Sequence, residues 1–503
     1  MMKIKLPPSS QNWISLIGAT IALVCLFMII FLFSVTVVLE QRAAYLGLVI
    51  YILLPAVMVM GLKLIPVGMF LRMRSIHHHK QEIKKIWPII DLNDIHHRNA
   101  FFVFSIGTAV FLFLSAIGSY EAFHFTESTT FCGTLCHSVM NPEYTAYQNS
   151  PHAQAGCVEC HVGPGADWYV RSKMSGLYQV YATAANVYPR PIPTPIRSLR
   201  PAREVCEQCH WPQKFYSHKI RHETHYLPDE ANTRWDIALV MKIGAAQSAL
   251  GLIQGIHWHI NPDVKIEYMA SDKIRETIPW VRYTNIKTGE VKVFLDQDKP
   301  LMDTQLDTME VRTMDCIDCH NRPSHLYRAP TLFINTAITA GEIPVSLPEI
   351  KKLCVEICAE EYPSIDSALA QIRESITSFY SDNYPEIIGT QKDEIEKAIT
   401  GLQKAFSRNI FPDMKVRWSA YPDHIGHLEF NGCFRCHNDI HATSEGEVIY
   451  KDCNLCHFIN AQGNSENQEI ALMGQALEFK HPEDIGEIWK ESLCVDCHTG
   501  LSP

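Results

Sequence analysis

The chain has 503 residues, with 44 Lys and Arg against 54 Asp and Glu, and a formal net charge of -10. With 19% charged and 47% hydrophobic residues, it is neither a disordered chain nor a bundle embedded wholly in a membrane. The acidic balance and the lack of a basic stripe exclude nucleic acid as a partner, because phosphate binding needs clustered Lys and Arg.

Three uncharged stretches in the first 120 residues predict transmembrane helices. The first, residues 13–39, has 27 residues without a charge, which is enough helix to cross a hydrocarbon core of about 30 Å. No small-residue cleavage site follows it, so we interpret it as an uncleaved anchor and not as a secretory signal. The second, residues 43–62, contains Pro55, which a membrane helix tolerates when neighbouring groups satisfy the freed carbonyl. The third comprises residues 100–120.

The distribution of Lys and Arg predicts the orientation of these spans. Cytoplasmic loops carry an excess of basic residues, and the connection between the first two spans offers only Arg42. The loop 63–99 is therefore expected to be cytoplasmic, with a cytoplasmic N-terminus and a periplasmic region after Tyr120. Residues 1–120 form the anchor, with the bilayer of a bacterial inner membrane as its first partner. The basic residues of the loop are Lys63, Arg72, Arg74, Lys80, Lys84, Lys85 and Arg98.

Six copies of the pattern Cys-x-x-Cys-His follow the third span. This is the attachment site of c-type haem, in which the two thiols form thioethers with the haem and the next imidazole binds the iron. A zinc ribbon would not require a histidine after every cysteine pair. The sequence thus predicts six covalent haems in an oxidising compartment. They are attached at Cys157/Cys160/His161, Cys206/Cys209/His210, Cys316/Cys319/His320, Cys433/Cys436/His437, Cys453/Cys456/His457 and Cys494/Cys497/His498.

A seventh site is irregular, because three residues separate Cys132 from Cys136. The extra residue can displace His137 from the iron and leave Met140 as the ligand. An ordinary His-ligated haem, with the methionine as a packing neighbour, stays open as the alternative. Seven haems use 14 of the 17 cysteines. Of the rest, two lie four residues apart on an expected helix and are either a disulfide or a pair of buried thiols. The remaining cysteines are Cys25, Cys354 and Cys358.

Histidines outside the motifs supply candidates for the second axial ligand of each iron. Imidazole on both faces gives a lower potential than a Met/His pair. His152 precedes Cys157 by five residues and is expected to serve a haem other than its neighbour. His257 and His259 alternate as on a strand, which puts both on one face, and a ligand role for them is left open. The candidates for distal ligands are His152, His225, His325, His427, His441 and His481.

The periplasmic part is expected to divide into four segments. Alternating residues at 264–268 and 280–283, with a turn signal at Lys287-Thr-Gly-Glu, predict a small antiparallel β insert. The fold class is therefore a membrane-anchored, mainly α protein with such an insert in a multihaem region. Seven sites in the 383 residues after Tyr120 imply haems in contact, as in an electron wire. The segments are 121–230 with three haems, 231–330 with the β insert and a fourth haem, the haem-free helical segment 331–412, and 413–503 with a three-haem cluster.

The region from residue 100 to about 220 resembles the NapC/NirT family of membrane-anchored multihaem cytochromes c. The resemblance is carried by Cys132-Gly-Thr-Leu-Cys-His-Ser-Val-Met, Tyr144-x-x-Tyr-x-x-Ser-Pro-His152 and Cys157-Val-Glu-Cys-His161, which follow the third span. The family oxidises membrane quinols and passes the electrons to periplasmic partners. The larger layout of three spans and seven haems resembles the ImcH-type inner-membrane cytochromes of metal-reducing bacteria.

The resemblance also implies roles for single residues. The first haem would lie at the membrane surface with Met140 on its iron, and His152 would bind a later haem. The quinol-site lysine of the family matches Lys173. The family's acidic residue seven positions further on is absent, so Asp167 or Glu143 is expected to serve instead. A lysine that merely lies at the headgroup level is the alternative for position 173.

The sequence therefore predicts a quinol dehydrogenase that oxidises menaquinol, with Met140, Lys173 and Asp167 as its catalytic candidates. Its electrons would reach soluble periplasmic c-type cytochromes or a terminal reductase in anaerobic respiration, including extracellular metal reduction. A multihaem reductase of a small nitrogen or sulfur oxyanion, with an open haem iron, is one rival interpretation. A redox sensor without catalytic activity is another.

Overall fold

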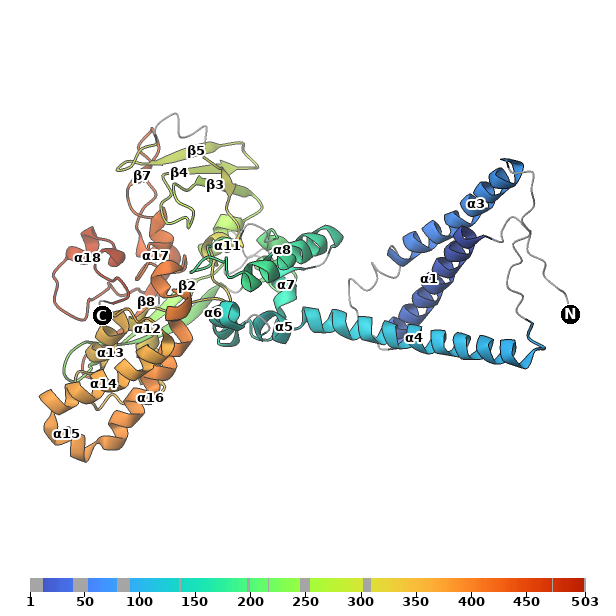
Figure 1. Ribbon diagram of the computed structural model, residues 1–503. Helices are drawn as coiled ribbons and strands as arrows, with labels where there is room; N and C mark the ends of the chain where they lie inside the picture. Colours follow the sequence, from blue (N-terminus) through green and yellow to red (C-terminus); the bar gives the residue numbers. More distant parts are fainter. Residues whose placement is uncertain are drawn as a thin grey trace. The chain divides into compact units, whose positions relative to one another are not determined.

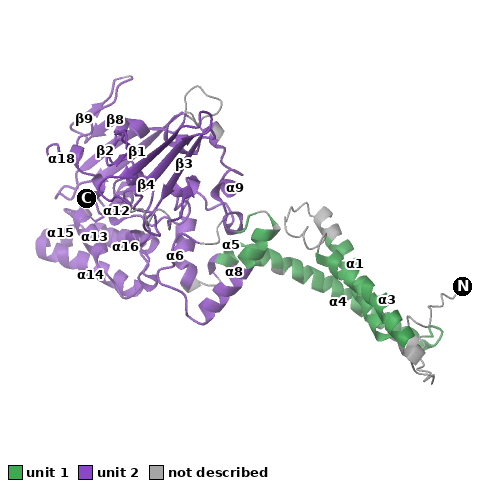
Figure 2. Cartoon of the chain, turned by 90° about the horizontal axis from the view of Figure 1, so that it is seen from above, with its two compact units in different colours: residues 1–132, 162–173 green, residues 133–161, 174–503 purple. Residues whose placement is uncertain are grey.

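The computed structural model describes residues 12–38, 53–78, 91–134, 137–163, 165–196, 200–215, 217–244, 254–301, 309–472 and 474–501. The chain forms two compact units (Figure 2). The first comprises Met1–Cys132 and Val162–Lys173, and the second comprises Gly133–His161 and Met174–Pro503.

The α-helices are α1 (Trp13–Val38), α3 (Leu54–His78), α4 (Ile95–Glu127), α5 (Thr129–Thr134), α6 (His137–Gln148), α7 (Cys157–His161), α8 (Ala166–Ala184), α9 (Ala202–Cys206), α11 (Cys316–Cys319), α12 (Pro330–Thr339), α13 (Ile350–Ala359), α14 (Ile365–Asn383), α15 (Pro385–Thr390), α16 (Lys392–Asn409), α17 (Cys453–Cys456) and α18 (Ile488–Glu491).

Short strands and 3₁₀ turns occupy much of the second unit. The strands are β1 (His218–Tyr226), β2 (Arg234–Lys242), β3 (Val264–Met269), β4 (Trp280–Asn285), β5 (Val291–Asp296), β6 (Arg312–Thr313), β7 (His441–Ala442), β8 (His457–Gly463) and β9 (Gln468–Ile470). The 3₁₀ helices are η3 (Pro212–Lys214), η4 (Ile256–Ile260), η5 (Pro412–Met414), η6 (Trp418–Ala420), η7 (Gly432–Arg435) and η8 (Cys494–Asp496).

Three long apolar helices dominate the first unit (Figure 1). Their membrane-competent stretches are Trp13–Leu32, Leu54–Arg74 and Phe101–Glu127, which confirms the predicted three-helix anchor. Helices α1 and α3 cross at Gly18 and Gly61, where a Cβ atom on either glycine would collide with the carbonyl oxygen of the other. Small residues at such a crossing let two helices approach closely where no hydrophobic driving force exists between them.

The second span differs from its predicted bounds. We expected residues 43–62, but helix α3 continues past Lys63 and Pro66 to His78, and residues 43–52 lie outside the described residues. The prediction ended the span at the first charge, whereas a lysine near a span can extend its ammonium group toward the polar interface. The expected loop 63–99 is shorter for the same reason. Helix α4 likewise extends past the predicted end at Tyr120 to Glu127.

Two antiparallel sheets build the second unit. One has the strand order β1-β2-β8-β9 and the other β6-β3-β4-β5-β7, so the predicted antiparallel β structure is confirmed. The hairpin of β1 and β2 crosses the expected boundary at residue 230, and strands from the last segment complete both sheets: His457 pairs with Met241, and His441 pairs with Asp296. The segment boundaries expected from the sequence therefore do not separate structural units. Alternation of polar and apolar residues predicts a strand, but it does not predict the strand with which it pairs.

The haem-free segment folds as helices α12 to α16 around a dry core. In α16, the residues Ile395, Ile399, Leu402 and Phe406 repeat at helical spacing and are all buried, as expected for a helix that faces a core along one stripe. In α13, Cys354 and Cys358 are buried free thiols. Of the two alternatives left open for this pair, a disulfide and a pair of buried thiols, the structure has the second.

A buried lysine in this core is expected to make stability depend on pH. The Lys351 side chain is 1% exposed, and its Nζ donates to the Thr331 carbonyl at 2.6 Å and to Asn335 Oδ1 at 2.7 Å. Burial lowers its pKa from 10.5 to about 7, so between these pH values the unfolded chain binds more protons than the folded chain. The free energy of unfolding should therefore rise with pH in that window, by up to about 1.4 kcal/mol per pH unit.

Urea unfolding followed by circular dichroism between pH 7 and pH 10 measures this dependence. The Lys351→Met variant should lose the slope. The Lys352→Met variant removes a neighbouring lysine whose side chain is 49% exposed, and it should keep the slope. Equal slopes in the wild type and in Lys351→Met would contradict the prediction.

Candidate functional site

The cysteine pairs lie on short helical turns. They occur on or beside α7, α9, α11, η7, α17 and η8, and a helical turn brings residues three apart onto one face. In α11 the turn is fixed locally, because the Asp315 carboxylate accepts from Cys316 N while the Asp318 side chain reaches back to the Asp315 N–H. This capping box presents the two thiols of the site together.

Each of the six regular motif histidines faces a second histidine from elsewhere in the chain. The distances between ring centroids lie between 5.9 and 6.3 Å. Two imidazoles that each bind the same metal through a bond of about 2 Å have their centroids roughly 6 Å apart. The spacing therefore fits one iron between each pair. The pairs are His161 with His325, His210 with His152, His320 with His257, His437 with His259, His457 with His427 and His498 with His481.

The outer ring nitrogens explain how the distal imidazoles are held. In five of the six distal histidines, Nδ1 lies 2.9 to 3.1 Å from a backbone carbonyl oxygen. A carbonyl oxygen only accepts, so in four of them Nδ1 carries the proton and Nε2 is left unprotonated for a metal. In the fifth, His481, Nδ1 also lies 3.2 Å from the Glu483 backbone N–H, which can donate to it, so this contact does not fix the tautomer. The carbonyls belong to Pro323, Ile243, Ile256, Glu143 and Glu483, which hold His152, His257, His259, His325 and His481 respectively.

Burial keeps most of these imidazoles neutral. It lowers the pKa of His427 and of His437 to about 4. Because the charged form is disfavoured away from water, the rings are present at neutral pH in the form that binds a metal. Burial also lowers the pKa of His161, His257, His259, His320, His325 and His457.

Two of the six histidines predicted as distal ligands contact other groups and not a motif histidine in the described part of the chain. The His441 ring is fully buried, with Nε2 2.6 Å from the Ile278 carbonyl and Nδ1 2.9 Å from Asn438 Oδ1, so both nitrogens have other partners. His225 is engaged by Glu223, whose carboxylate lies 3.5 Å from Nε2, and by Asn335.

The rings that face His320 and His437 are instead those of His257 and His259. These lie on the 3₁₀ helix η4 and not on a strand, so the two rings point to different motif histidines. The alternation of the two histidines in the sequence was a signal for a site, but it gave the wrong geometry.

A cavity of about 1820 Å³ joins four of the histidine pairs. Its lining includes both rings of each pair and seven motif thiols. The donor set is the one that c-type haem needs, with thiols for attachment and imidazoles on both faces of the iron. The residues therefore fit haem c. The four pairs are His152/His210, His257/His320, His259/His437 and His427/His457.

Three of the predicted attachment cysteines, Cys160, Cys209 and Cys497, differ from the enclosed position that a cofactor-binding residue usually has. All three are exposed and none lines the cavity, whereas the other cysteine of each motif is half-buried. The spacing of a motif does not predict burial, because a thioether only requires that the thiol reach the haem edge. Cys209 N donates to Cys206 O and Cys497 N to Cys494 O, both at 3.2 Å, so each of these two thiols stays on its partner's turn. Haem attachment at each motif cysteine, exposed or enclosed, stays a prediction.

The motifs also approach one another in chain order. The thiols of Cys206 and Cys316 are hydrogen-bonded to each other, and thiols of the other successive regular motifs interact electrostatically. Haems attached at such close thiols would be near one another. The further interacting pairs are Cys160 with Cys206, Cys319 with Cys433, Cys433 with Cys456, and Cys453 with Cys494.

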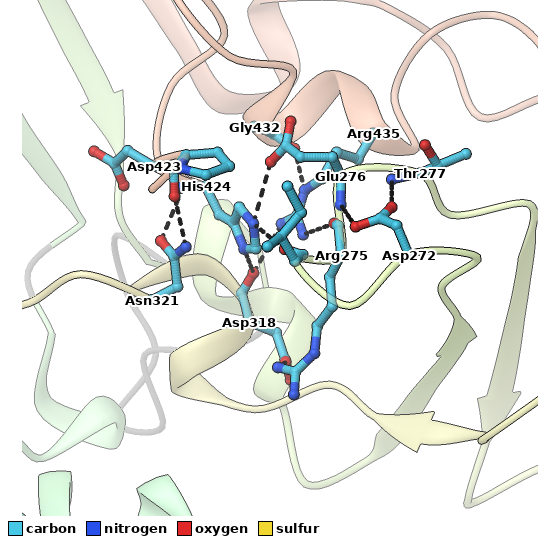
Figure 3. A network of polar contacts seen from close by, with 12 residues as sticks. Asp272, Arg275, Glu276, Thr277, Asp318, Asn321, Asp423, His424, Gly432 and Arg435 are labelled. Carbon is cyan, nitrogen blue, oxygen red and sulfur yellow. Dashed lines mark hydrogen bonds and ion pairs between the residues drawn. The ribbon is translucent and has the colours of Figure 1, made fainter. Parts of the chain in front are cut away.

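A polar network fixes two successive motifs against each other (Figure 3). The Asp318 carboxylate, 1% exposed, accepts from Arg275 at 2.9 Å and from Arg312 at 2.6 Å. Arg435, inside the Cys433 motif, donates to the Asp318 carbonyl at 2.8 Å. His424 contacts the same carbonyl through Nδ1 at 3.1 Å, so it belongs to this scaffold (Figure 3).

Lys173, the lysine that the family resemblance singles out, has a carboxylate partner that the sequence analysis missed. Lys173 Nζ lies 3.5 Å from Glu127 Oε1 and 5.2 Å from the centre of the Tyr169 ring. Asp167 is exposed at the start of α8, and six residues along a helix place it on another face from Lys173. Glu143 instead lies with Oε2 3.1 Å from His325 Nδ1. Glu127 was missed because the third span was ended at Tyr120.

The irregular first site is described only in part. Cys132 and the half-buried Met140 belong to the described residues. Cys136 and the side chain of His137 lie outside them, so the choice between Met140 and His137 stays a prediction.

Apolar spans, paired imidazoles and motif thiols together define a membrane-anchored multihaem c-type cytochrome. Residues 95–191 match the N-terminal region of the NapC/NirT cytochrome c family. The chain is 43% identical over 487 residues to the cytochrome c-type protein ImcH of Geobacter sulfurreducens. This alignment covers 97% of the present chain and 95% of ImcH. The chain therefore belongs to the NapC/NirT family. It is an inner-membrane cytochrome of respiratory electron transfer and carries covalent haem c.

A second relative matches only the N-terminal part. The chain is 31% identical over 111 residues to the cytochrome c-type protein NrfH of Wolinella succinogenes. This alignment covers 22% of the present chain and 61% of NrfH. No solved structure matches the chain.

Proposed function

We propose that the protein is a quinol dehydrogenase that passes electrons from menaquinol through seven covalent haems to a periplasmic acceptor. The N-terminus is cytoplasmic and the second unit is periplasmic. The acceptor is a soluble c-type cytochrome or a terminal reductase. The observation that carries the proposal is the second imidazole opposite each of the six regular motif histidines, with Met140 as the ligand proposed for the seventh haem.

Bound haem c supplies one-electron chemistry at its iron. The protein's contribution is to hold two imidazoles on each of six irons, which favours a low potential and thus a low-potential donor such as menaquinol. The same imidazoles occupy the positions that a nitrogen or sulfur oxyanion would need. This arrangement disfavours the rival function of a reductase with an open iron among the six regular sites.

Helix α8 supports a quinol site at the membrane surface. Its exposed apolar side chains repeat at helical spacing, whereas its Lys173 is tied to Glu127, the last residue of the third span. Exposed apolar area costs about 25 cal/mol per Å² in water, and lipid removes that cost. We place the lysine at the headgroup level, where it donates a hydrogen bond to a quinol oxygen. The apolar residues are Val170, Met174, Leu177, Tyr178 and Tyr181.

Reduction by quinol in liposomes tests the function. The reconstituted oxidised protein should be reduced by a short-chain menaquinol, two haems for each quinol, as followed by the α-band absorbance. Dithionite gives the full extent of reduction as a control. Protein that dithionite reduces and menaquinol leaves oxidised would contradict the proposal. Turnover of nitrite without any partner protein would favour the rival reductase.

A further inference from the structure

We infer that Glu127 is the group that accepts the quinol protons, an inference that rests on the proposed quinol oxidation. Seven positions after Lys173 the chain has Val180, so that position offers the lysine no carboxylate. The structure offers a carboxylate to the same lysine from another element, the end of the third span.

The geometry leaves Glu127 able to accept a proton. Its side chain is only 16% exposed, and Oε1 faces Lys173 Nζ at 3.5 Å. Among the described residues, this buried oxygen accepts no hydrogen bond. A carboxylate oxygen that accepts no hydrogen bond keeps capacity for a quinol hydroxyl. Lys173, as an ammonium group beside a carboxylate, is a donor and not a base.

The surroundings suit a flat quinol ring. The Phe123 and Tyr169 rings lie 6.5 Å apart between α4 and α8, and Tyr120 packs edge-on against His124 at 4.4 Å. His124 lies one turn before Glu127, and its buried Nε2 has no hydrogen-bond partner in the described part of the chain. The titratable group that faces Glu127 is Lys173 from α8; Tyr169 from the same helix contacts that lysine, and His124 lies on the preceding turn of α4.

The proposed step balances protons and electrons. One quinol O–H bond breaks, its proton moves to the Glu127 carboxylate, and one electron moves to a ferric c-type haem. The carboxylic acid then releases the proton to water at the outer surface. The second O–H bond reacts in the same way, so one quinol yields one quinone, two protons and two electrons. Lys173 keeps its proton throughout and holds the quinol oxygen.

The test compares three variants of the full chain in liposomes, with a short-chain menaquinol as donor. Glu127→Gln should lower kcat about 100-fold at neutral pH, within the range for loss of a general base, with a smaller change in KM. Its pH profile should also lose the fall in rate on the acidic side. Glu127→Asp should restore much of the rate. Glu121→Gln removes the same charge from an exposed position of α4, and it should behave as the wild type.

Haem content and reduction by dithionite show whether each variant is intact. If the wild type is reduced by menaquinol and Glu127→Gln matches it at every pH, the role of Glu127 is overturned while quinol oxidation stands. If menaquinol does not reduce the wild type, both the role of Glu127 and the proposed quinol oxidation are wrong. If Glu127→Gln lacks haem, the Glu127→Asp variant tests the inference instead. A Glu127→Asp protein with the same rate and the same pH profile as the wild type would count against the role of Glu127.

Discussion

Replacing His259 by alanine is expected to turn one low-spin haem high-spin and to interrupt electron flow. The ring of His259 faces His437 at 5.9 Å, and its Nδ1 is held by the Ile256 carbonyl. If both rings bind one iron as proposed, the removal of His259 leaves that iron with one imidazole. The potential of this haem should rise, because a strong ligand is lost. A rise of about 120 mV would hold an electron there roughly 100-fold more strongly, since about 59 mV is a factor of ten for one electron.

Electron paramagnetic resonance of the oxidised protein counts the low-spin and high-spin irons, and stopped-flow reduction gives the rate. His441→Ala is the matched control, because it removes a buried histidine that the sequence also nominated but that contacts Ile278 and Asn438. It should lower stability and leave the number of low-spin haems unchanged. A high-spin haem in His441→Ala and none in His259→Ala would refute the assignment.

Asp318→Ala should cost about 3 kcal/mol of stability. Breaking a buried ion pair typically costs about 3–5 kcal/mol, and the carboxylate is 1% exposed. The cost should lie at the lower end of this range, because the side chains of Arg275 and Arg312 are 20% and 29% exposed. Water therefore partly solvates their charges when the carboxylate is removed. The loss should loosen the junction between the Cys316 and Cys433 motifs.

The midpoint of urea unfolding measures this cost. Lys287→Ala removes an exposed ion pair with Asp263, in which the two side chains are 71% and 43% exposed, and it should cost less than about 1 kcal/mol. If both variants unfolded at the same urea concentration, the proposed scaffold role of Asp318 would be wrong.

The covalent and membrane features could be predicted because their chemistry is local. Haem attachment needs two thiols and an imidazole within five residues, and a span needs one long apolar run. The distal ligands could be predicted only in part. His152, His325, His427 and His481 face motif histidines as expected, and the roles of these residues as ligands stay proposals.

The other contacts depend on tertiary structure. A single 3₁₀ turn sends His257 and His259 toward motifs that lie more than a hundred residues apart, and periodicity carries no information about such partners. Glu127 illustrates the same point, because its partner Lys173 lies 46 residues further along the chain. The exposure of Cys209 and Cys497 is a third case, since local spacing is the same in exposed and in enclosed motifs.

The facing imidazoles have a consequence for how the protein matures. Once an iron binds both rings of a pair, it closes a chain loop, and the pair His259 and His437 closes one of 178 residues. A cross-link over a loop longer than about 100 residues removes roughly 4–5 kcal/mol of chain entropy from the unfolded state in the simplest treatment. Coordination would therefore cross-link the second unit as well as set the haem potential. In the proposed orientation this cross-link cannot close until residue 437 has been exported, so the middle of the unit would be fixed late in biogenesis.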